Sequence, residues 1–363
     1  MRRSMIAQAA AIALGMAASA LAADAPRYVV DASWPKQLPN NWIMGQVGGL
    51  AVDSRDHVWV NQRPRSLTTD EKGATLMPPE SKCCAPAPAI MEFDVEGNLV
   101  QAWGGPGNGY EWPEVEHGIF VDSKNFVWVA GNGPKDGQIL KFTRDGKFVK
   151  QIGSRGDFNS NDVSRLGRPA DLWVEEADNE IYVADGYGNH RVIVFDTDSG
   201  AYKRHWGAYG KPPSDEKVPA YDPKAPPSPH FANPVHCVQI APDDLVYVCD
   251  RTNNRIQIFR KNGTFVAEWF YEKATLRAGS TWDLAMSPDP ARSLLFIADG
   301  TNNEIRMLDR KTGEVLGAFG HNGRNAGEFH WIHQLAVDSK WNVYTGEVDT
   351  GKRIQKFTRA QAR

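Results

Sequence analysis

A unit of four short strands recurs six times along the chain, and this repetition constrains the fold more than any other feature. Each unit starts with an apolar strand and a tight turn, and its second strand ends in a polar residue. A third strand of the type Arg-Ile-Gln-Ile-Phe, a glycine turn and a fourth strand complete it. The fold class is therefore predicted to be all-β, a six-bladed β-propeller of four-stranded blades. The first strands of the six blades are predicted at residues 48–53, 117–122, 170–175, 236–241, 282–287 and 333–338.

The sixth unit has no predicted fourth strand, because the chain ends shortly after its third strand at residues 353–357. The apolar segment at residues 28–31 belongs to none of the six units. If it pairs with the sixth blade as the missing strand, it closes the ring and removes an open sheet edge. We therefore expect residues 23–363 to form a single propeller domain that an N-terminal strand closes.

The first 22 residues have the features of a secretory signal peptide. Arg2 and Arg3 precede an apolar, alanine-rich stretch, and residues 20–22 fit the small-x-small cleavage pattern. The stretch is short and no stop-transfer segment follows it, so we expect a periplasmic or secreted protein with no membrane attachment after cleavage. A net charge of −3 gives no basic surplus for nucleic acid. We further expect a monomer.

Histidine recurs at the first position of the predicted first strands. Alternate blades of a six-bladed ring are a third of a turn apart, so histidines from blades 2, 4 and 6 can meet near the central channel. Three neutral imidazoles with an open coordination position are typical of catalytic zinc sites. Imidazole also suits iron and copper, so these remain alternatives, as does a structural calcium ion. In blade order, the first position holds Gly48, His117, Ala170, His236, Trp282 and His333.

The long connections between predicted strands all fall at the end of the propeller where the first strands begin. They are residues 64–89, 104–116, 154–169 and 208–235. Long loops on a rigid scaffold usually carry function. The histidine end is therefore the predicted functional face.

The Asp-x-Thr-Asn-Asn segments at residues 250–259 and 299–306 resemble NHL repeats. The sequence around the histidines, together with residues 183–191 and 249–257, resembles the peptidyl-α-hydroxyglycine α-amidating lyases, which are six-bladed propellers with a three-histidine zinc site. The resemblance implies that His117, His236 and His333 bind zinc, that Tyr187 and Arg63 are catalytic, and that Arg251 binds substrate.

The residue types fit these roles. Arg63, Tyr187 and Arg251 each follow a predicted second strand, so all three lie at the histidine end. A tyrosine near a cation can act as a base, and an arginine can bind a carboxylate with two hydrogen bonds. The alternatives are a packed rim aromatic for Tyr187 and solvated rim charges for the two arginines.

The resemblance implies an exported zinc-dependent lyase that cleaves the carbon–nitrogen bond of an α-hydroxy amide. The products are an amide and a glyoxylate-like aldehyde, and the substrate is a small molecule or a peptide. Gln334 follows the third histidine where the family usually has an acidic residue, and the loop at residues 64–89 also differs. Two alternatives therefore stay open: a metal-dependent hydrolase or hydratase on another small molecule, and a non-catalytic NHL binding scaffold.

Four cysteines are expected to form disulfides in an exported protein. Cys237 and Cys249 lie equally far from the turn centre at Asp243, so they face each other across two antiparallel strands. A pair of small buried thiols is the alternative. The adjacent pair Cys83 and Cys84 favours a vicinal disulfide, with a redox pair or an additional soft ligand site as alternatives.

Overall fold

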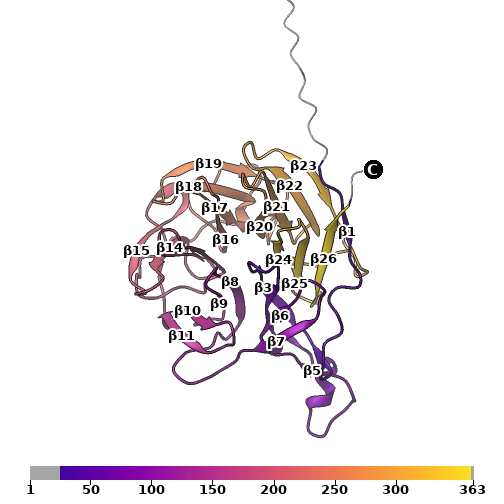
Figure 1. Cartoon of the computed structure of the whole chain (residues 1–363). Helices are drawn as coiled ribbons and strands as arrows, with labels where there is room; N and C mark the ends of the chain where they lie inside the picture. The colour runs from indigo at the N-terminus through magenta and orange to yellow at the C-terminus, as the bar shows by residue number, and fades with distance from the viewer. Residues whose placement is uncertain (1–24, 361–363) are drawn as a thin grey trace, which may run out of the picture.

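Short apolar strands joined by tight polar turns form six four-stranded antiparallel sheets, which surround a central axis as the blades of a propeller (Figure 1). The computed structural model describes residues 25–360, so the predicted signal peptide at residues 1–22 lies outside the described residues. Within the described range, no helix has the length and apolar character needed to cross a membrane. The predicted fold class is confirmed.

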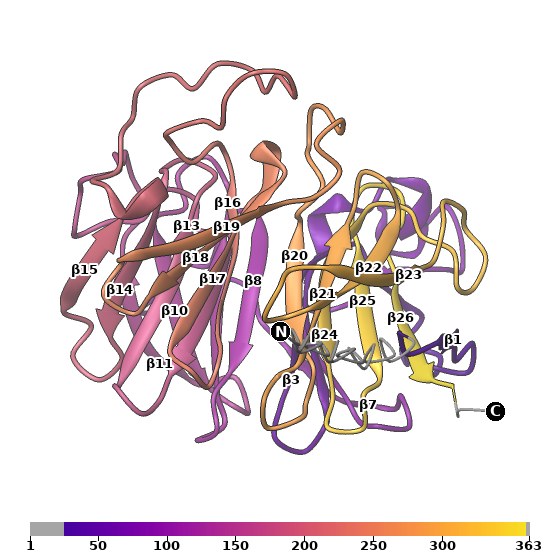
Figure 2. The same cartoon turned by 90° about the horizontal axis from the view of Figure 1, so that it is seen from above.

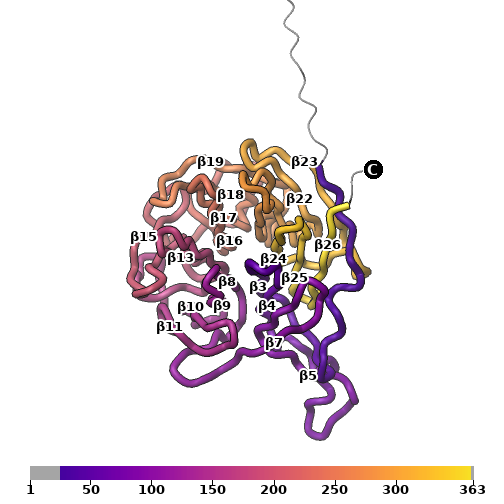
Figure 3. The backbone as a smooth tube through the Cα atoms, viewed as in Figure 1, coloured from indigo at the N-terminus to yellow at the C-terminus, as the bar shows by residue number. Residues whose placement is uncertain are grey.

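The blades follow one another in chain order around the ring, as the backbone trace shows (Figure 3). Blade 1 contains β3 (Gln46–Val52), β4 (Val58–Arg63), β6 (Ile90–Phe93) and β7 (Leu99–Trp103). Blade 2 contains β8 (Glu116–Val121), β9 (Phe126–Gly131), β10 (Gln138–Thr143) and β11 (Phe148–Gly153). Blade 3 contains β12 (Asp171–Glu175), β13 (Glu180–Asp185), β14 (Arg191–Asp196) and β15 (Tyr202–Trp206).

The second half of the ring repeats the same order. Blade 4 contains β16 (Val235–Ile240), β17 (Leu245–Asp250), β18 (Arg255–Arg260) and β19 (Phe265–Phe270). Blade 5 contains β20 (Asp283–Met286), β21 (Leu294–Asp299), β22 (Glu304–Asp309) and β23 (Val315–Phe319). Blade 6 contains β24 (Ile332–Val337), β25 (Val343–Glu347), β26 (Ile354–Arg359) and the N-terminal β1 (Tyr28–Val30).

Strand β1 closes the ring, as the sequence predicts. It pairs antiparallel with β26, and Val29 lies opposite Thr358. The outer edge of blade 6 is thereby covered by a segment from the other end of the chain. The remaining described elements lie in the connections: β2 (Trp42–Ile43), β5 (Ala85–Pro86), η1 (Pro64–Ser66), η2 (Asp70–Thr75), η3 (Ala208–Gly210) and η4 (Arg251–Asn253).

Apolar side chains fill the space between neighbouring blades. Between blades 3 and 4, for example, Tyr182 and Val194 share one buried cluster with Val246 and Phe259. Burial of these faces against one another is the main force that holds the ring together. The first strands line a central cavity of about 320 Å³. The long connections project from one end of the ring, where the site described below lies (Figure 2).

Candidate metal centre

Three histidines lie near the start of the first, innermost strands of alternate blades. They are His117 in β8, His236 in β16 and His333 in β24. Each coincides with a β-bulge, where the pairing register to the second strand shifts. In β16, for instance, Val235 pairs with Asp250 and Cys237 with Cys249, so His236 is the extra residue. A bulge redirects a side chain out of the regular alternation, and here it turns each imidazole toward the axis.

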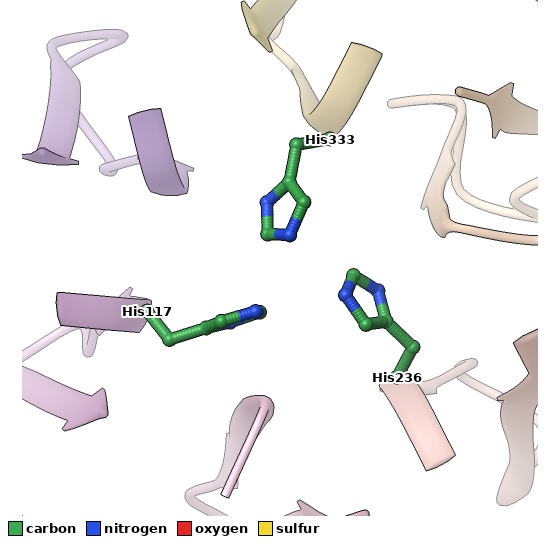
Figure 4. A group of neighbouring side chains, drawn as sticks. All are labelled: His117, His236 and His333. Atoms are coloured by element: carbon green, nitrogen blue, oxygen red, sulfur yellow. The ribbon is translucent and has the colours of Figure 1, made fainter. Parts of the chain in front are cut away.

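The three imidazole rings converge on one point (Figure 4). Their centroids are 5.2 Å apart for His117 and His236, 4.6 Å for His117 and His333, and 4.8 Å for His236 and His333. One ring nitrogen of each lies within 4.8 Å of one ring nitrogen of each of the other two. Zinc-bound imidazole nitrogens lie about 2 Å from the metal, so the three side chains are close enough to bind one ion after small shifts of the rings.

Backbone carbonyls of the next blade fix two of the rings. His117 Nδ1 lies 2.6 Å from the carbonyl oxygen of Ala170, and His236 Nδ1 is hydrogen-bonded to the carbonyl oxygen of Trp282. A carbonyl can only accept, so Nδ1 carries the proton and the Nε2 lone pair faces the centre. Hydrogen bonds of this kind commonly orient metal-binding histidines. The Nδ1 atom of His333 is buried without a hydrogen-bond partner in the described chain.

Burial holds the three imidazoles in the neutral form. It lowers the pKa of His117, His236 and His333 well below the ordinary value, and the nearby positive charges of Arg63 and Arg251 lower it further. Metal binding requires unprotonated nitrogen. The site is therefore ready to accept a cation at neutral pH without first losing protons from its histidines.

Tyr187 follows β13 and stands beside the histidines. Its hydroxyl oxygen lies 3.1 Å from His117 Nε2 and 3.0 Å from His236 Nε2. Arg251, which follows β17, donates from Nη1 to the same oxygen at 3.2 Å. The Arg251 guanidinium carbon also lies 4.3 Å from the centroid of the Trp282 ring, so this indole borders the site. The hydroxyl, the guanidinium and the histidine nitrogens thus meet in one small volume.

Arg63 approaches from blade 1. Its Nε donates to the carbonyl oxygen of Glu116 at 2.7 Å, and its Nη1 donates to Gln46 Oε1 at 2.9 Å. Glu116 directly precedes His117, so the guanidinium lies at the edge of the histidine cluster. The structure therefore brings all six predicted metal, catalytic and substrate residues together at one end of the channel.

Side chains of the odd-numbered blades support the bulges. Asp171 Oδ2 accepts the backbone N–H of Val238 at 3.1 Å, and Asp283 Oδ2 accepts that of Leu335 at 2.8 Å. Each contact lies two residues beyond a histidine. Asn61 of blade 1 plays a related part, since its Nδ2 donates to the carbonyl oxygens of His117 and Gly118.

A second cluster of possible ligands, Asp53, His57 and Glu92, is satisfied without a metal. Arg144 is ion-paired with both carboxylates, 2.8 Å from Asp53, and Arg55 lies 3.1 Å from Glu92. The indole Nε1 of Trp59 also donates to Asp53 Oδ2, and Asp53 Oδ1 accepts two backbone N–H groups. Two guanidinium groups already occupy the positions a cation would take, so this cluster is an ion-pair network.

The structure joins the cysteines in the predicted pairs. Cys237 and Cys249 are cross-strand partners in a disulfide with a Cα–Cα distance of 4.9 Å. Because Cys237 follows His236, this bond fastens the start of β16 to β17 immediately next to the bulge. Cys83 and Cys84 form a vicinal disulfide in the loop at residues 64–89.

Comparison with known proteins identifies the repeat. Residues 166–195 and 235–259 match the NHL repeat family. These two segments, in blades 3 and 4, therefore resemble NHL repeats. NHL repeat-containing protein 3 of Mus musculus is 25% identical over 353 residues, which cover 92% of this chain and 84% of that protein.

Other relatives of this chain have names that include an activity. Peptidyl-glycine alpha-amidating monooxygenase B of Xenopus laevis is 24% identical, and the match covers 92% of this chain but only 36% of that longer protein. A probable peptidyl-alpha-hydroxyglycine alpha-amidating lyase of Caenorhabditis elegans is 28% identical over 60% of this chain and 56% of that protein. A streptogramin B lyase structure has a TM-score of 0.52 at 13% identity, covering 92% of this chain and 98% of that chain. The last match supports the propeller fold alone.

Several residues of the site were not predicted from the sequence. Asp171 and Asp283 occupy the second position of the aligned first strands, next to the position that revealed the histidines, so the same alignment could have found them. Arg168 and Trp331 line the site from connecting loops. No periodicity marks residues in such loops, and the sequence carries no signal for these two.

Proposed function

We propose that this chain is an exported metal-dependent carbon–nitrogen lyase that acts on an α-hydroxy amide, with His117, His236 and His333 as the zinc ligands. The observation that carries the proposal is the convergence of three buried, neutral imidazoles on one point, with the Tyr187 hydroxyl within 3.1 Å of one and 3.0 Å of another. The relatives named as amidating enzymes give additional support. Two disulfides are in keeping with export.

The donor set fits zinc. Three imidazoles leave a coordination position open, which is typical of catalytic rather than structural sites. When bound, zinc would supply a Lewis acid that polarises a substrate oxygen. The residues of the chain have the remaining tasks, which are to bind the substrate, to orient it and to move one proton.

Tyr187 is placed to move that proton. Its oxygen would accept the proton of the substrate hydroxyl, while its own proton passes to the amide nitrogen. The carbon–nitrogen bond breaks, the hydroxyl carbon becomes an aldehyde, and the nitrogen leaves as a neutral amide. No oxidant or reductant is needed. Arg251 donates to the same tyrosine oxygen and can stabilise negative charge there as it develops.

Arg251 and Arg63 are suited to bind the carboxylate next to the reacting carbon. Neither guanidinium forms an ion pair with a carboxylate among the described residues, and Arg251 Nε is buried without a partner. A buried guanidinium without a counter-ion has a strong tendency to bind an anion.

The experiment is glyoxylate release from N-benzoyl-α-hydroxyglycine by zinc-loaded protein. We expect turnover by the wild type and a decrease in kcat of about 100-fold in Tyr187→Phe, as is typical when a general acid–base group is lost. Zinc content should not change in this variant. Tyr202→Phe is the matched control, because Tyr202 is exposed in the blade 3 strand β15 and its hydroxyl is hydrogen-bonded to His205, away from the metal centre.

Two results would contradict the proposal. If zinc-loaded wild type releases no glyoxylate, the site does not perform this reaction, and a hydrolase or hydratase becomes the better hypothesis. If Tyr187→Phe and Tyr202→Phe have equal activity, Tyr187 does not move the proton.

A further inference from the structure

A third arginine lies beside the proposed catalytic residues. The guanidinium carbon of Arg168 is 5.8 Å from the centroid of the Tyr187 ring, and that of Arg251 is 5.7 Å from it. Arg168 belongs to the loop between β11 and β12, whereas Arg251 follows β17. Two positively charged groups therefore reach one aromatic ring from different blades.

The backbone and one nitrogen of Arg168 are held firmly. Its N–H donates to the carbonyl oxygen of Asp136, and its own carbonyl accepts the N–H of Tyr187 at 3.2 Å. These contacts maintain a left-handed backbone conformation with φ of 60°. Nε donates to the carbonyl oxygen of Asn132 at 2.9 Å. The two terminal nitrogens have no hydrogen-bond partner in the described part of the chain.

The arginines inside the blades differ in this respect. Arg191 lies 2.9 Å from Asp185, Arg255 lies 2.7 Å from Asp250, and Arg306 lies 2.6 Å from Asp299. Each of these carboxylates ends a second strand, so the pair repeats from blade to blade. Among the described residues, Arg63, Arg168 and Arg251 have no such carboxylate.

Two acidic groups at this end of the ring, Asp136 and Glu116, already have other partners. The carboxylate of Asp136 accepts the backbone N–H groups of Glu114 and Gly133, at 2.9 Å and 2.7 Å. Glu116 is bound by Arg65 at 3.0 Å. The face thus has three guanidinium groups available to an anion, although the carboxylate of an α-hydroxyglycine would require only the two nearest the histidines.

We propose that the natural substrate is a dianion, whose second carboxylate, on the acyl side of the amide, is bound by the terminal nitrogens of Arg168. This inference rests on the proposed lyase function for the identity of the reacting group. Arg168 would be a specificity-determining residue, because it contacts the substrate away from the bond that breaks. A guanidinium fixed at Nε presents its two terminal N–H groups together, which suits the two oxygens of a carboxylate.

Turnover of a matched substrate pair tests the specificity. N-succinyl- and N-butyryl-α-hydroxyglycine have acyl chains of equal length and differ in a terminal carboxylate. We expect zinc-loaded wild type to favour the succinyl compound in kcat/KM by about tenfold or more, as for one charge-assisted hydrogen-bonded pair. Arg168→Gln should remove this preference, because kcat/KM for the succinyl compound should fall by about tenfold more than kcat/KM for the butyryl compound. Equal kcat/KM for the two compounds in wild type would overturn the inference.

Arg277→Gln is the matched control. Arg277 is exposed, also has a left-handed backbone with φ of 61°, and lies in the connection from β19 to β20. Its loss removes the same charge from the molecule, so it should keep the preference for the succinyl compound. If both variants lose the preference for the succinyl compound equally, the preference arises from the net charge of the protein. That result would overturn a specific role for Arg168.

Direct binding separates this inference from the lyase proposal. Succinate and butyrate can be titrated into the zinc-loaded protein, with heat as the signal. We expect succinate to bind at least about tenfold more tightly in wild type and equally to butyrate in Arg168→Gln. If this holds while glyoxylate is never released, the dianion site stands and the lyase proposal fails. If glyoxylate is released but succinate has no advantage, the dianion inference fails alone.

Discussion

The even-numbered and odd-numbered blades contribute different parts of the same site. Blades 2, 4 and 6 present the histidines on bulged first strands, whereas blades 1, 3 and 5 provide the groups that hold those bulges. Asp171 and Asp283 each bind a backbone N–H beyond a histidine, and Ala170 and Trp282 accept from the imidazoles themselves. Each histidine is thus held by the blade before it, and two are also held by the blade after it.

This division indicates that the site is largely formed before any ion binds. Ligands that packing and hydrogen bonds already orient lose less freedom on binding, so they bind more tightly. The pattern is incomplete at His333, whose Nδ1 has no partner in the described chain. There the following blade is blade 1, and none of its described carbonyl groups accepts from this nitrogen. His333 is therefore the least constrained of the three.

The largest expected effect comes from removing the even-blade groups. In the double variant with His117→Ala and His236→Ala, zinc content should fall from about one ion per chain to almost none, because one imidazole is insufficient for a stable zinc site. Elemental analysis of purified protein measures this. Retention of a full equivalent of zinc would show that the metal, if present, binds elsewhere.

His57→Ala is the control for this experiment. His57 belongs to the Asp53–Glu92 network at the other candidate cluster, where arginines already neutralise the carboxylates. Its replacement should leave the zinc content unchanged. If His57→Ala loses zinc while the double variant retains it, the metal binds at the Asp53, His57 and Glu92 cluster of blade 1 instead.

Removing an odd-blade support should have a smaller effect. Asp171→Ala leaves the Val238 N–H without its acceptor and loosens the bulge that directs His236, so we expect zinc affinity to fall by about 10- to 100-fold, as for other groups that orient metal ligands. Competition with a chromophoric chelator measures the affinity. Asp171→Asn keeps an acceptor oxygen and should restore most of it.

Asp196→Ala is the corresponding control in the same blade. Asp196 ends β14 and binds the turn at Ser199, away from the channel. Zinc affinity should stay at the wild-type value in this variant. If Asp171→Ala also binds zinc with wild-type affinity, the contacts from the odd-numbered blades do not position the histidines.

The sequence was sufficient to predict the propeller and the meeting of the histidines, because both depend on a regular repeat. The six units, the closing strand and the position shared by His117, His236 and His333 are all visible in aligned strands. The bulges are not visible in this way, since a bulge is a mismatch between two paired strands. The anchoring by Asp171 and Asp283 depends on contacts across blades, and Arg168 depends on the path of an irregular loop.

The smallest expected effect concerns stability and pH. Burial raises the pKa of Asp171 to about 7, and burial together with the nearby Asp171 raises the pKa of Asp283 well above its ordinary value. At pH values between the ordinary and the raised pKa, the folded chain binds more protons than the unfolded chain. The free energy of unfolding should therefore decrease as the pH rises through this range. Asp283→Asn removes one of the two acids and retains an acceptor for Leu335 N–H.

Urea unfolding of zinc-free protein between about pH 5 and pH 8 measures this dependence. We expect the decrease in the free energy of unfolding with rising pH in this range to be shallower in Asp283→Asn than in wild type. Asp196→Asn is the control: hydrogen bonds from Ser199 lower the pKa of Asp196, so its contribution changes only at acid pH and the wild-type slope should persist. If Asp283→Asn has the wild-type slope, burial does not raise the pKa of Asp283 as expected. The role of Asp171 and Asp283 in the site is then limited to their two hydrogen bonds.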